Sequence, residues 1–139
     1  MSSTAKNIEF VQSLYRAFGN RDIPSILAVL SPTVEWGEPP NPYNPAAGTR
    51  HGYEGFLEWL RVGNESEEVL VLEPRDFLAN LQSVAVVGYT KCRVRATGKE
   101  YETEFVHLVT LKDGKVERFR EFFDTYAAAE AFREQGKDA

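Results

Sequence analysis

The chain is poor in the residue types that hold structures together covalently or through metal ions. Cysteine occurs once, methionine once and histidine twice in 139 residues. Cys92 has no partner for an intramolecular disulfide, and we interpret it as a small core hydrophobe. The two histidines and the scattered carboxylates lack the spacing of metal ligands, so we expect no metal site and no cofactor. Neither a Gly-rich phosphate loop nor a Ser nucleophile elbow is present.

Long apolar runs and basic clusters are missing too. No apolar run approaches 18 residues and no charged segment leads into an apolar one, so we expect neither a membrane span nor a secretory leader. A reducing cytoplasm is the expected location. The net charge is −5, from 16 basic and 21 acidic side chains. Because phosphate-backbone affinity comes from clustered Lys and Arg, we expect no nucleic-acid partner and no membrane partner.

Apolar and aromatic residues are plentiful. Of the residues, 42% are hydrophobic, and seventeen are aromatic: nine Phe, six Tyr and two Trp. A chain of this length buries roughly two-thirds of its unfolded surface and needs no metal or disulfide to stay folded. We therefore expect a single domain over residues 1–139.

The first half has the 3.6-residue period of helices. Ser2, Ser3 and Thr4 offer capping oxygens for a helix that ends at Gly19. Asp22 can cap a second helix, which Ser31-Pro32 would stop. A third helix is expected over residues 53–62, with a glycine stop directly after it.

The second half has the two-residue period of strands. Strands are expected over 69–78, 84–96, 101–112 and 116–123, with a closing helix over 126–135. Thr97-Gly98 and Asp113-Gly114 predict two-residue hairpin turns, and Pro74 indicates a sheet edge or a bulge. Helices followed by an antiparallel meander predict an α+β domain in which helices cover one face of a curved sheet.

Strict register through both turns sorts the sheet into two faces. His107 falls on the core face with Arg120 opposite it, and Glu121 falls on the other face. That other face is predicted to carry charged pairs and an apolar portion, which a second subunit could cover, so we expect a homodimer. The predicted charged pairs are Lys91–Glu104, Arg93–Glu102 and Arg95–Glu100, and the apolar portion is Tyr89, Val106, Leu108 and Phe119.

His107 has two interpretations at this point. It is either a buried neutral imidazole with one hydrogen bond, or a polar group at the base of a ligand cavity that acts as acid or base.

The arrangement of elements and the segment 110–125 (TLKDGKVERFREFFDT) resemble a known family. With the Trp36 strand and the Gly52-Tyr53-Glu54-Gly55 entry to the third helix, the chain is similar to the SnoaL-like branch of the nuclear transport factor two-like superfamily. Ketosteroid isomerase and limonene-epoxide hydrolase are relatives. The resemblance implies a cone that encloses an apolar pocket, usually in a homodimer. This fold hosts isomerases, cyclases, hydrolases and non-catalytic binders.

The resemblance also implies a catalytic carboxylate. Glu121 matches the position of the acid/base carboxylate in the last strand of SnoaL-like cyclases and limonene-epoxide hydrolases, and a β-bulge would be needed to bring it to the same cavity as His107. The alternative is an exposed Glu among other charges. Gly88 and Thr90 stand where the hydrolase has its Arg and Asp, and Trp36 stands where ketosteroid isomerase has its Asp. Epoxide hydrolysis and standard steroid isomerisation are therefore disfavoured.

We expect the remaining pocket residues to bind a small, hydrophobic, oxygenated molecule. The predicted set is Tyr15, Phe18, Trp36, Tyr43, His51, Phe105 and Phe122. The Pro-rich segment 37–50 is expected at the mouth of the cone, either as a lid or as a stiff surface loop without a ligand role. The leading hypothesis is an isomerase, cyclase or hydrolase that uses Glu121 and His107. The alternatives are a non-catalytic binding or dimeric scaffold module, or a trafficking adaptor.

Overall fold

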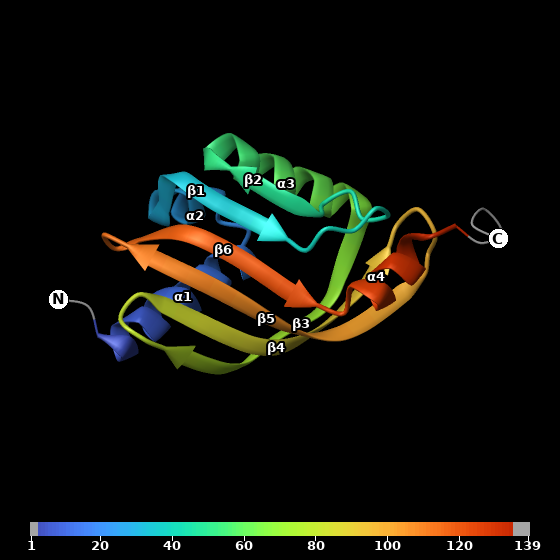
Figure 1. Cartoon of the computed structure of the whole chain (residues 1–139). Coiled ribbons are helices and arrows are strands. Elements are labelled where there is room, and N and C mark those ends of the chain that lie inside the picture. Colours follow the sequence, from blue (N-terminus) through green and yellow to red (C-terminus); the bar gives the residue numbers. More distant parts are fainter. Residues whose placement is uncertain (1–2, 135–139) are drawn as a thin grey trace.

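A computed structural model of the chain describes residues 3–134, which form four helices and one six-stranded sheet (Figure 1). In chain order the elements are α1 (Thr4–Gly19), α2 (Ile23–Val29), β1 (Leu30–Glu38), β2 (Gly48–His51), α3 (Gly52–Ser66), β3 (Glu67–Ala79), β4 (Ser83–Val94), β5 (Glu100–Lys112), β6 (Lys115–Phe123) and α4 (Thr125–Phe132).

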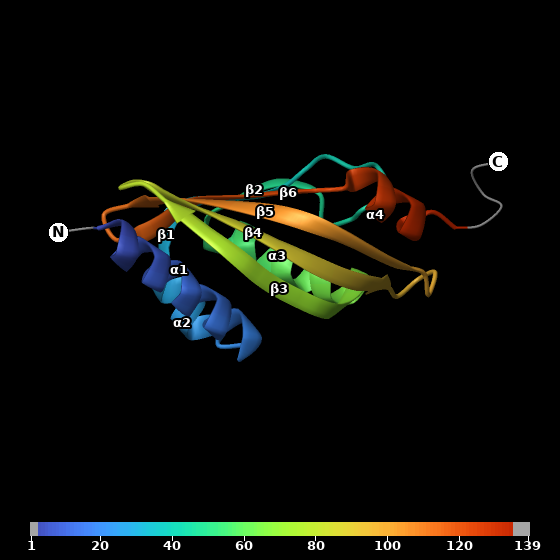
Figure 2. The same cartoon turned by 90° about the horizontal axis from the view of Figure 1, so that it is seen from below.

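The sheet has the strand order β2-β1-β6-β5-β4-β3, and its only parallel pair in residues 3–134 is β1 with β6. The strands curl around α1, α2 and α3, which lie together on one side of the sheet (Figure 2). The short helix α4 packs against β5 and β4 at one end of the sheet. The predicted α+β cone is thereby confirmed. No helix in the described part of the chain is long and apolar enough to cross a membrane.

The helix starts follow from their caps. The Ser3 hydroxyl accepts the Lys6 N–H at 3.0 Å, and the Asp22 carboxylate accepts the Ser25 N–H, as the sequence predicts. Three helix ends differ from the prediction. The closing helix α4 ends at Phe132 instead of residue 135, which lies outside the described residues. The second helix stops at Val29, because the next residue already belongs to β1, and α3 runs through Gly63 to Ser66.

The two predicted hairpin turns have different outcomes. At Asp113-Gly114 both residues have positive φ, 53° and 75°, and a two-residue turn joins β5 to β6 as expected. The prediction at Thr97-Gly98 is wrong, because residues 95–99 all lie between β4 and β5. The pairing of β4 with β5 therefore slides by two residues, which keeps the side chains of these two strands on their predicted faces.

This slide changes the charged pairs on the outer face. Arg93 lies opposite Glu100 and pairs with it at 2.8 Å, and the Lys91 ammonium lies 3.5 Å from the same carboxylate. The predicted pairs Lys91–Glu104, Arg93–Glu102 and Arg95–Glu100 are therefore wrong.

A β-bulge in the last hairpin decides which side chains reach the concave face. Near the turn Leu111 pairs with Val116, but from Thr110 onward the register shifts by one residue. Because side chains alternate, this shift turns the rest of β6 over. The predicted bulge is confirmed, and it places Glu121 opposite His107.

The same bulge overturns three expectations made from strict register. Arg120 lies opposite Leu108 instead of His107. Phe122 is 42% exposed and lies on the outer face. Phe119, predicted for the outer face, is 7% exposed and packs in the core.

Pro74 lies in the edge strand β3, beside a second irregularity in register, as predicted. The opposite residue, Gly88, has no room for a side chain. A Cβ there would lie 2.3 Å from the Glu73 carbonyl oxygen and 2.4 Å from Cζ of Phe105. Glycine at this position lets the buried Phe105 ring lie flat on the concave face.

Candidate functional site

A cavity of about 840 Å³ lies between the concave face of the sheet and helices α1, α2 and α3. Its walls are mainly apolar and aromatic, but three glutamates, a histidine and two tyrosines also face it. The polar lining residues central to the site are Tyr15, Glu38, Glu67, Tyr101, His107 and Glu121.

A chain of short hydrogen bonds crosses the cavity wall from α1 to β6. The Tyr15 hydroxyl lies 2.5 Å from Nδ1 of His107, and Nε2 of His107 lies 2.6 Å from Oε2 of Glu121. The His107 and Glu121 side chains are 7% and 18% exposed, so water has little access to this pair. The structure therefore brings both predicted catalytic residues to one cavity.

The protonation of these three hydrogen-bonded side chains follows from Tyr15. Burial, and secondarily the charge of Glu121, raise the pKa of the Tyr15 phenol well above its ordinary value, so the phenol keeps its proton and donates it. Nδ1 of His107 is then the acceptor. In a neutral imidazole the proton sits on Nε2, which donates to the carboxylate of Glu121.

Aromatic rings hold the His107 imidazole in place. Phe105 stacks on it with ring centres 4.1 Å apart, and Phe119 lies 4.9 Å away on β6. Phe105 was predicted to bind substrate, but it is 1% exposed and absent from the cavity lining. Its contact is with His107, so it supports the imidazole from behind.

Glu38 faces the same cavity, although it is not among the site residues predicted from the sequence. Its Oε2 accepts the indole N–H of Trp59 at 2.6 Å, and its Oε1 accepts the amide N–H of Asn44 at 3.2 Å. Burial, followed by the charge of Glu121, raises the pKa of Glu38 to about 8. The signal that could have found it is the strand alternation, which puts Glu38 on the same face as Trp36.

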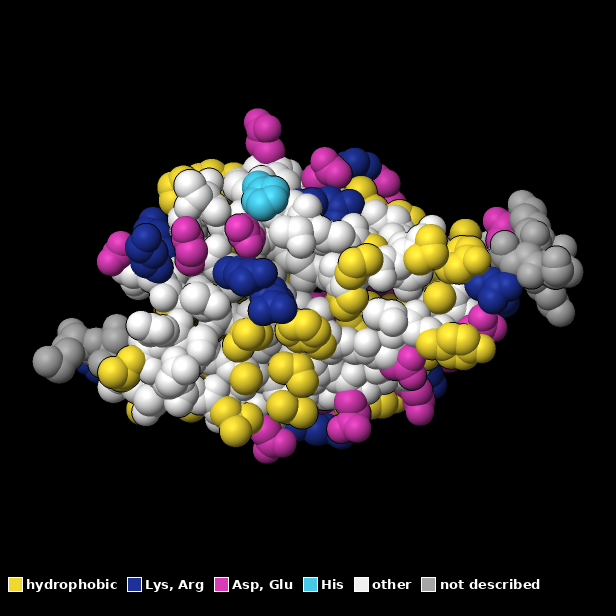
Figure 3. Space-filling model, viewed as in Figure 1, with side chains coloured by type: hydrophobic (Ala, Val, Ile, Leu, Met, Phe, Trp, Pro, Cys, Tyr) yellow, Lys and Arg dark blue, Asp and Glu magenta, His cyan; other side chains and the backbone are white. Residues whose placement is uncertain are grey.

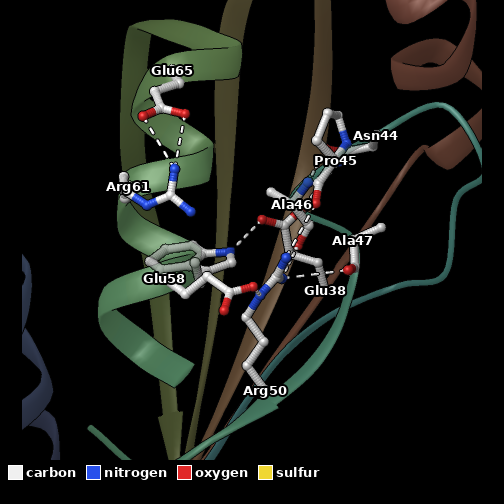
Figure 4. A network of polar contacts seen from close by, with 10 residues as sticks. Glu38, Asn44, Pro45, Ala46, Ala47, Arg50, Glu58, Arg61 and Glu65 are labelled. Carbon is white, nitrogen blue, oxygen red and sulfur yellow. Dashed lines mark hydrogen bonds and ion pairs between the residues drawn. The ribbon is translucent and has the colours of Figure 1, made fainter. Parts of the chain in front are cut away.

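The Pro-rich segment builds the surroundings of Glu38 (Figure 4). The Arg50 guanidinium donates to the carbonyl oxygens of Ala46 and Pro45 at 2.8 Å and 3.1 Å and pairs with Glu58 on α3 at 3.3 Å. These bonds tie residues 39–47 to α3. The loop in turn places the Asn44 amide against Glu38, although none of residues 39–47 lines the cavity itself.

A second polar group lies elsewhere in the cavity. The Tyr101 hydroxyl donates to Glu67 at 2.7 Å, and burial raises the pKa of Glu67 above its ordinary value. Cys92 is buried beside them, as predicted, and burial raises the pKa of its thiol to about 12. A thiol with that pKa is a poor nucleophile at neutral pH. Neither Glu67 nor Tyr101 had a local sequence signal that linked it to the site.

The structure divides the predicted substrate-binding residues. Tyr15, Phe18 and Trp36 line the cavity. Outside its lining lie Tyr43, 40% exposed beneath the Arg133 guanidinium, His51, exposed at the start of α3, and the outward-facing Phe122. Tyr43 and His51 belong to surface segments, and the bulge turns Phe122 away.

Trp36 packs tightly in the cavity wall. Its indole stacks on Phe119 with ring centres 4.0 Å apart and meets the ring of Phe56 edge-on at 4.7 Å. Within residues 3–134 its Nε1 has no hydrogen-bond partner. Two residues later on the same strand, Glu38 places a carboxyl group in the cavity lining.

The described residues contain no group of three or more His, Cys, Asp or Glu side chains arranged to hold a metal ion. The three cavity glutamates make hydrogen bonds instead, to His107, to Trp59 with Asn44, and to Tyr101.

Several solved structures share this architecture. An NTF2-like protein from Burkholderia xenovorans LB400 is 33% identical, with a TM-score of 0.88, over 96% of this chain and 100% of that chain. An NTF2-like protein from Burkholderia pseudomallei K96243 is 27% identical, with a TM-score of 0.81, over 91% and 96%. TerC, co-crystallised with polyporic acid, is 32% identical, with a TM-score of 0.74, over 91% and 97%.

No curated protein matches the sequence. The SnoaL-like domain model matches residues 11–119, which span α1 through most of β6. The match ends two residues before Glu121. Because it covers most of the chain, and the fold and cavity agree with it, the chain belongs to the SnoaL-like domain family.

Proposed function

We propose that this protein is a cofactor-independent enzyme that moves protons on a small, hydrophobic, oxygenated molecule held in the cavity. The observation that carries the proposal is the 2.6 Å contact between His107 and Glu121 on the cavity wall. A carboxylate and an imidazole in an enclosed apolar site are the groups that general acid–base catalysis uses.

Glu121 is the proton acceptor in this proposal. Its carboxylate faces the cavity and takes a proton from the bound molecule. The Nε2–H of His107 fixes the position of Oε2 and stabilises the negative charge, and the Tyr15 hydroxyl holds the imidazole in the tautomer that does so. The same three groups return the proton in a later step, so the reaction class is isomerisation or cyclisation.

The shape of the wall supports an aromatic or otherwise flat apolar ligand. Phe18, Trp36 and Trp59 line one side of the cavity within 6.4 Å of one another. TerC, 32% identical over most of its length, was crystallised with polyporic acid. Polyporic acid therefore serves as the first probe.

Gly88 makes epoxide hydrolysis a poorer candidate. The Arg–Asp pair that this reaction uses in the relatives would need a side chain at Gly88, and a Cβ there overlaps Phe105 and the β3 backbone. Without that pair, this cavity lacks the group that protonates the epoxide oxygen in the relatives.

Ligand binding can be measured through the protein's own fluorescence. The chain has two tryptophans, and both line the cavity. We expect titration with polyporic acid to quench tryptophan fluorescence with saturation, after correction with free tryptophan amide. Phe18→Asp places a charge in the wall and is expected to weaken binding, whereas Leu81→Asp, at a 66% exposed site, is the control.

Catalysis is tested with the natural ligand. Mass spectrometry of protein purified from cells identifies what co-purifies, and the purified compound is then incubated with wild type, Glu121→Gln and Glu104→Gln. We expect Glu121→Gln to retain binding and lose conversion by about 100-fold or more, the usual contribution of acid–base catalysis. Binding without conversion by wild type would instead identify a non-catalytic binding module.

We also propose that the outer face of the sheet pairs with a second copy of the chain. Hydrophobic side chains gather over the middle of this face, with charged groups around them (Figure 3). Val87, Val106 and Leu108 are partly exposed there, and Phe122 is 42% exposed. Compared with the sequence-based expectation, Phe122 replaces Phe119 in this surface. An apolar sheet face of this kind is a common homodimer interface.

A further inference from the structure

Glu38 and Glu121 reach the cavity from adjacent parallel strands. Trp36 of β1 is paired with Phe119 of β6, and Gly37 is paired with Arg120. One residue further along each strand are Glu38 and Glu121, and both line the cavity. The fold therefore brings two carboxyl groups to one wall from positions that are distant in sequence.

The two carboxyl groups have different partners. Glu121 receives the imidazole N–H of His107, whereas Glu38 receives two N–H groups that never carry charge. The orientation of the Asn44 amide is fixed, because its Oδ1 accepts the Ala46 N–H at 2.9 Å. Its NH₂ group therefore faces Glu38. The donor on the other side, the Trp59 indole, has no acceptor capacity at all.

The charged groups that shift the pKa of Glu38 are of its own sign. Glu121 on β6 and Glu67 on β3 both raise its pKa electrostatically, in addition to burial. Arg21 and Arg61 also line the cavity, and Arg61 pairs with Glu65 at 3.1 Å. Arg50, which Figure 4 also shows, donates to loop carbonyl oxygens and pairs with Glu58. No ion pair involves Glu38 within residues 3–134. Two carboxylates that face one enclosed cavity and repel each other do not readily ionise together.

We propose that Glu38 is a second catalytic carboxyl group, which donates a proton to an oxygen of the ligand while Glu121 removes a proton from carbon. This inference rests on the proposed function and assigns the site a substrate class, namely a carbonyl compound with a hydrogen on the adjacent carbon. Two carboxyl groups held in opposite protonation states by their surroundings are a recognised basis for acid–base catalysis.

The step balances without any further reactant. The C–H bond breaks, and its proton goes to Glu121 while its electron pair forms a carbon–carbon double bond. The carbonyl π pair takes the proton of Glu38, which leaves an enol, a Glu38 carboxylate and a Glu121 carboxylic acid. When a carbon–carbon double bond adjoins the carbon that lost its proton, the enol is a dienol. Glu121 then returns its proton to the far carbon of that double bond, while the enol O–H proton goes back to Glu38 and the carbonyl re-forms. The double bond has moved, and both carboxyl groups are restored.

The protonation of Glu38 can be measured without a substrate. Infrared difference spectra over a pH titration, with ¹³C-labelled glutamate for assignment, report the C=O stretch of a protonated carboxyl group. We expect wild type to show this band at pH 7 and to lose it with a midpoint near pH 8. Glu38→Gln is expected to remove the band, and Glu104→Gln, at an exposed site, is expected to leave it.

Two further variants test how Glu121 and Trp59 shift the pKa of Glu38. Glu121→Gln removes a neighbouring negative charge, so we expect the midpoint to fall. Trp59→Phe removes a donor to the charged form, so we expect the midpoint to rise by about one pH unit. Circular dichroism confirms the fold of each variant. Should Glu38→Gln fail to fold, Trp59→Phe still decides the question, because the midpoint moves only if the band belongs to Glu38.

Failure of the Glu38 assignment and failure of the proposed function give different results. If the band is absent at pH 7, or if Glu121→Gln removes it and Glu38→Gln does not, the assignment of Glu38 is overturned while the cavity retains a proton-transfer pair. If Glu38 carries the proton but neither polyporic acid nor any co-purifying compound binds, the proposed function fails while the protonation result stands.

Discussion

Nε2 of His107 and Oε2 of Glu121 lie 2.6 Å apart, and a single inserted residue at the Thr110/Leu111 step makes this contact possible. Without the bulge, the two side chains would be on opposite faces of the sheet. The bulge thus places both side chains of the β5–β6 hairpin on the cavity face. Bulges occur frequently beside functional residues.

The first prediction concerns the tautomer of His107. Because Tyr15 donates to Nδ1, ¹⁵N NMR at pH 7.5 is expected to show the proton on Nε2. Tyr15→Phe removes that donor and is expected to change the ¹⁵N shifts of His107. The chain has only two histidines, so His51→Gln assigns the signals and serves as the control. A proton on Nδ1 in wild type would contradict the proposed direction of the hydrogen bonds from Tyr15 through His107 to Glu121.

The second prediction concerns stability and pH. The pKa of Glu38 in the folded chain is raised from 4.5 to about 8, so between these values the folded state binds more protons than the unfolded state. The contribution of Glu38 to the free energy of unfolding is therefore favourable below pH 4.5 and is lost as pH rises through 8. Between these values the free energy of unfolding falls by up to about 1.4 kcal/mol per pH unit.

Urea unfolding at pH 5, 6.5 and 8 checks this slope. Glu38→Gln cannot ionise, so its free energy of unfolding is expected to fall less between pH 5 and 8 than that of wild type. Glu104→Gln, exposed on the outer face, is expected to follow the wild-type curve. Parallel curves for wild type and Glu38→Gln would show that Glu38 does not take up a proton on folding.

The third prediction compares two glycines. Gly88→Ala puts a methyl group 2.3 Å from the Glu73 carbonyl oxygen, which belongs to a paired strand and cannot move freely. We expect a loss of about 1–3 kcal/mol in the free energy of unfolding, together with displacement of Phe105. Gly63→Ala, in α3 with open space around the new Cβ, is expected to stabilise by up to about 1 kcal/mol. Equal effects at the two sites would rule out the close contact at Gly88.

The fourth prediction concerns assembly. Leu108→Lys places a charge at the centre of the apolar outer face, and light scattering coupled to size exclusion is expected to show a monomer where wild type is a dimer. Leu81→Lys adds the same charge at an exposed position between β3 and β4 and is expected to remain dimeric. A wild-type monomer at micromolar concentration would refute the proposed pairing.

Much of the fold follows from local sequence. Ser3 and Asp22 cap the helices they were predicted to cap, and the alternation of apolar residues gives β4 and β5 their faces. Asp113-Gly114 forms the predicted two-residue turn, because its residues adopt the positive φ values that the turn requires. Even where the turn at Thr97-Gly98 was wrong, the faces survived, since a shift of two residues preserves alternation.

By itself, the sequence determined the helices, the faces of β4 and β5 and the family resemblance, because these depend on neighbouring residues and on motifs that can be read in order. Only the tertiary structure decided which carboxyl groups share the cavity. Glu38 and Glu121 meet because β1 and β6 are parallel neighbours, and Glu67 joins them because the sheet curls. Strand neighbourhood and curvature arise from long-range packing, and no local pattern in the chain encodes them.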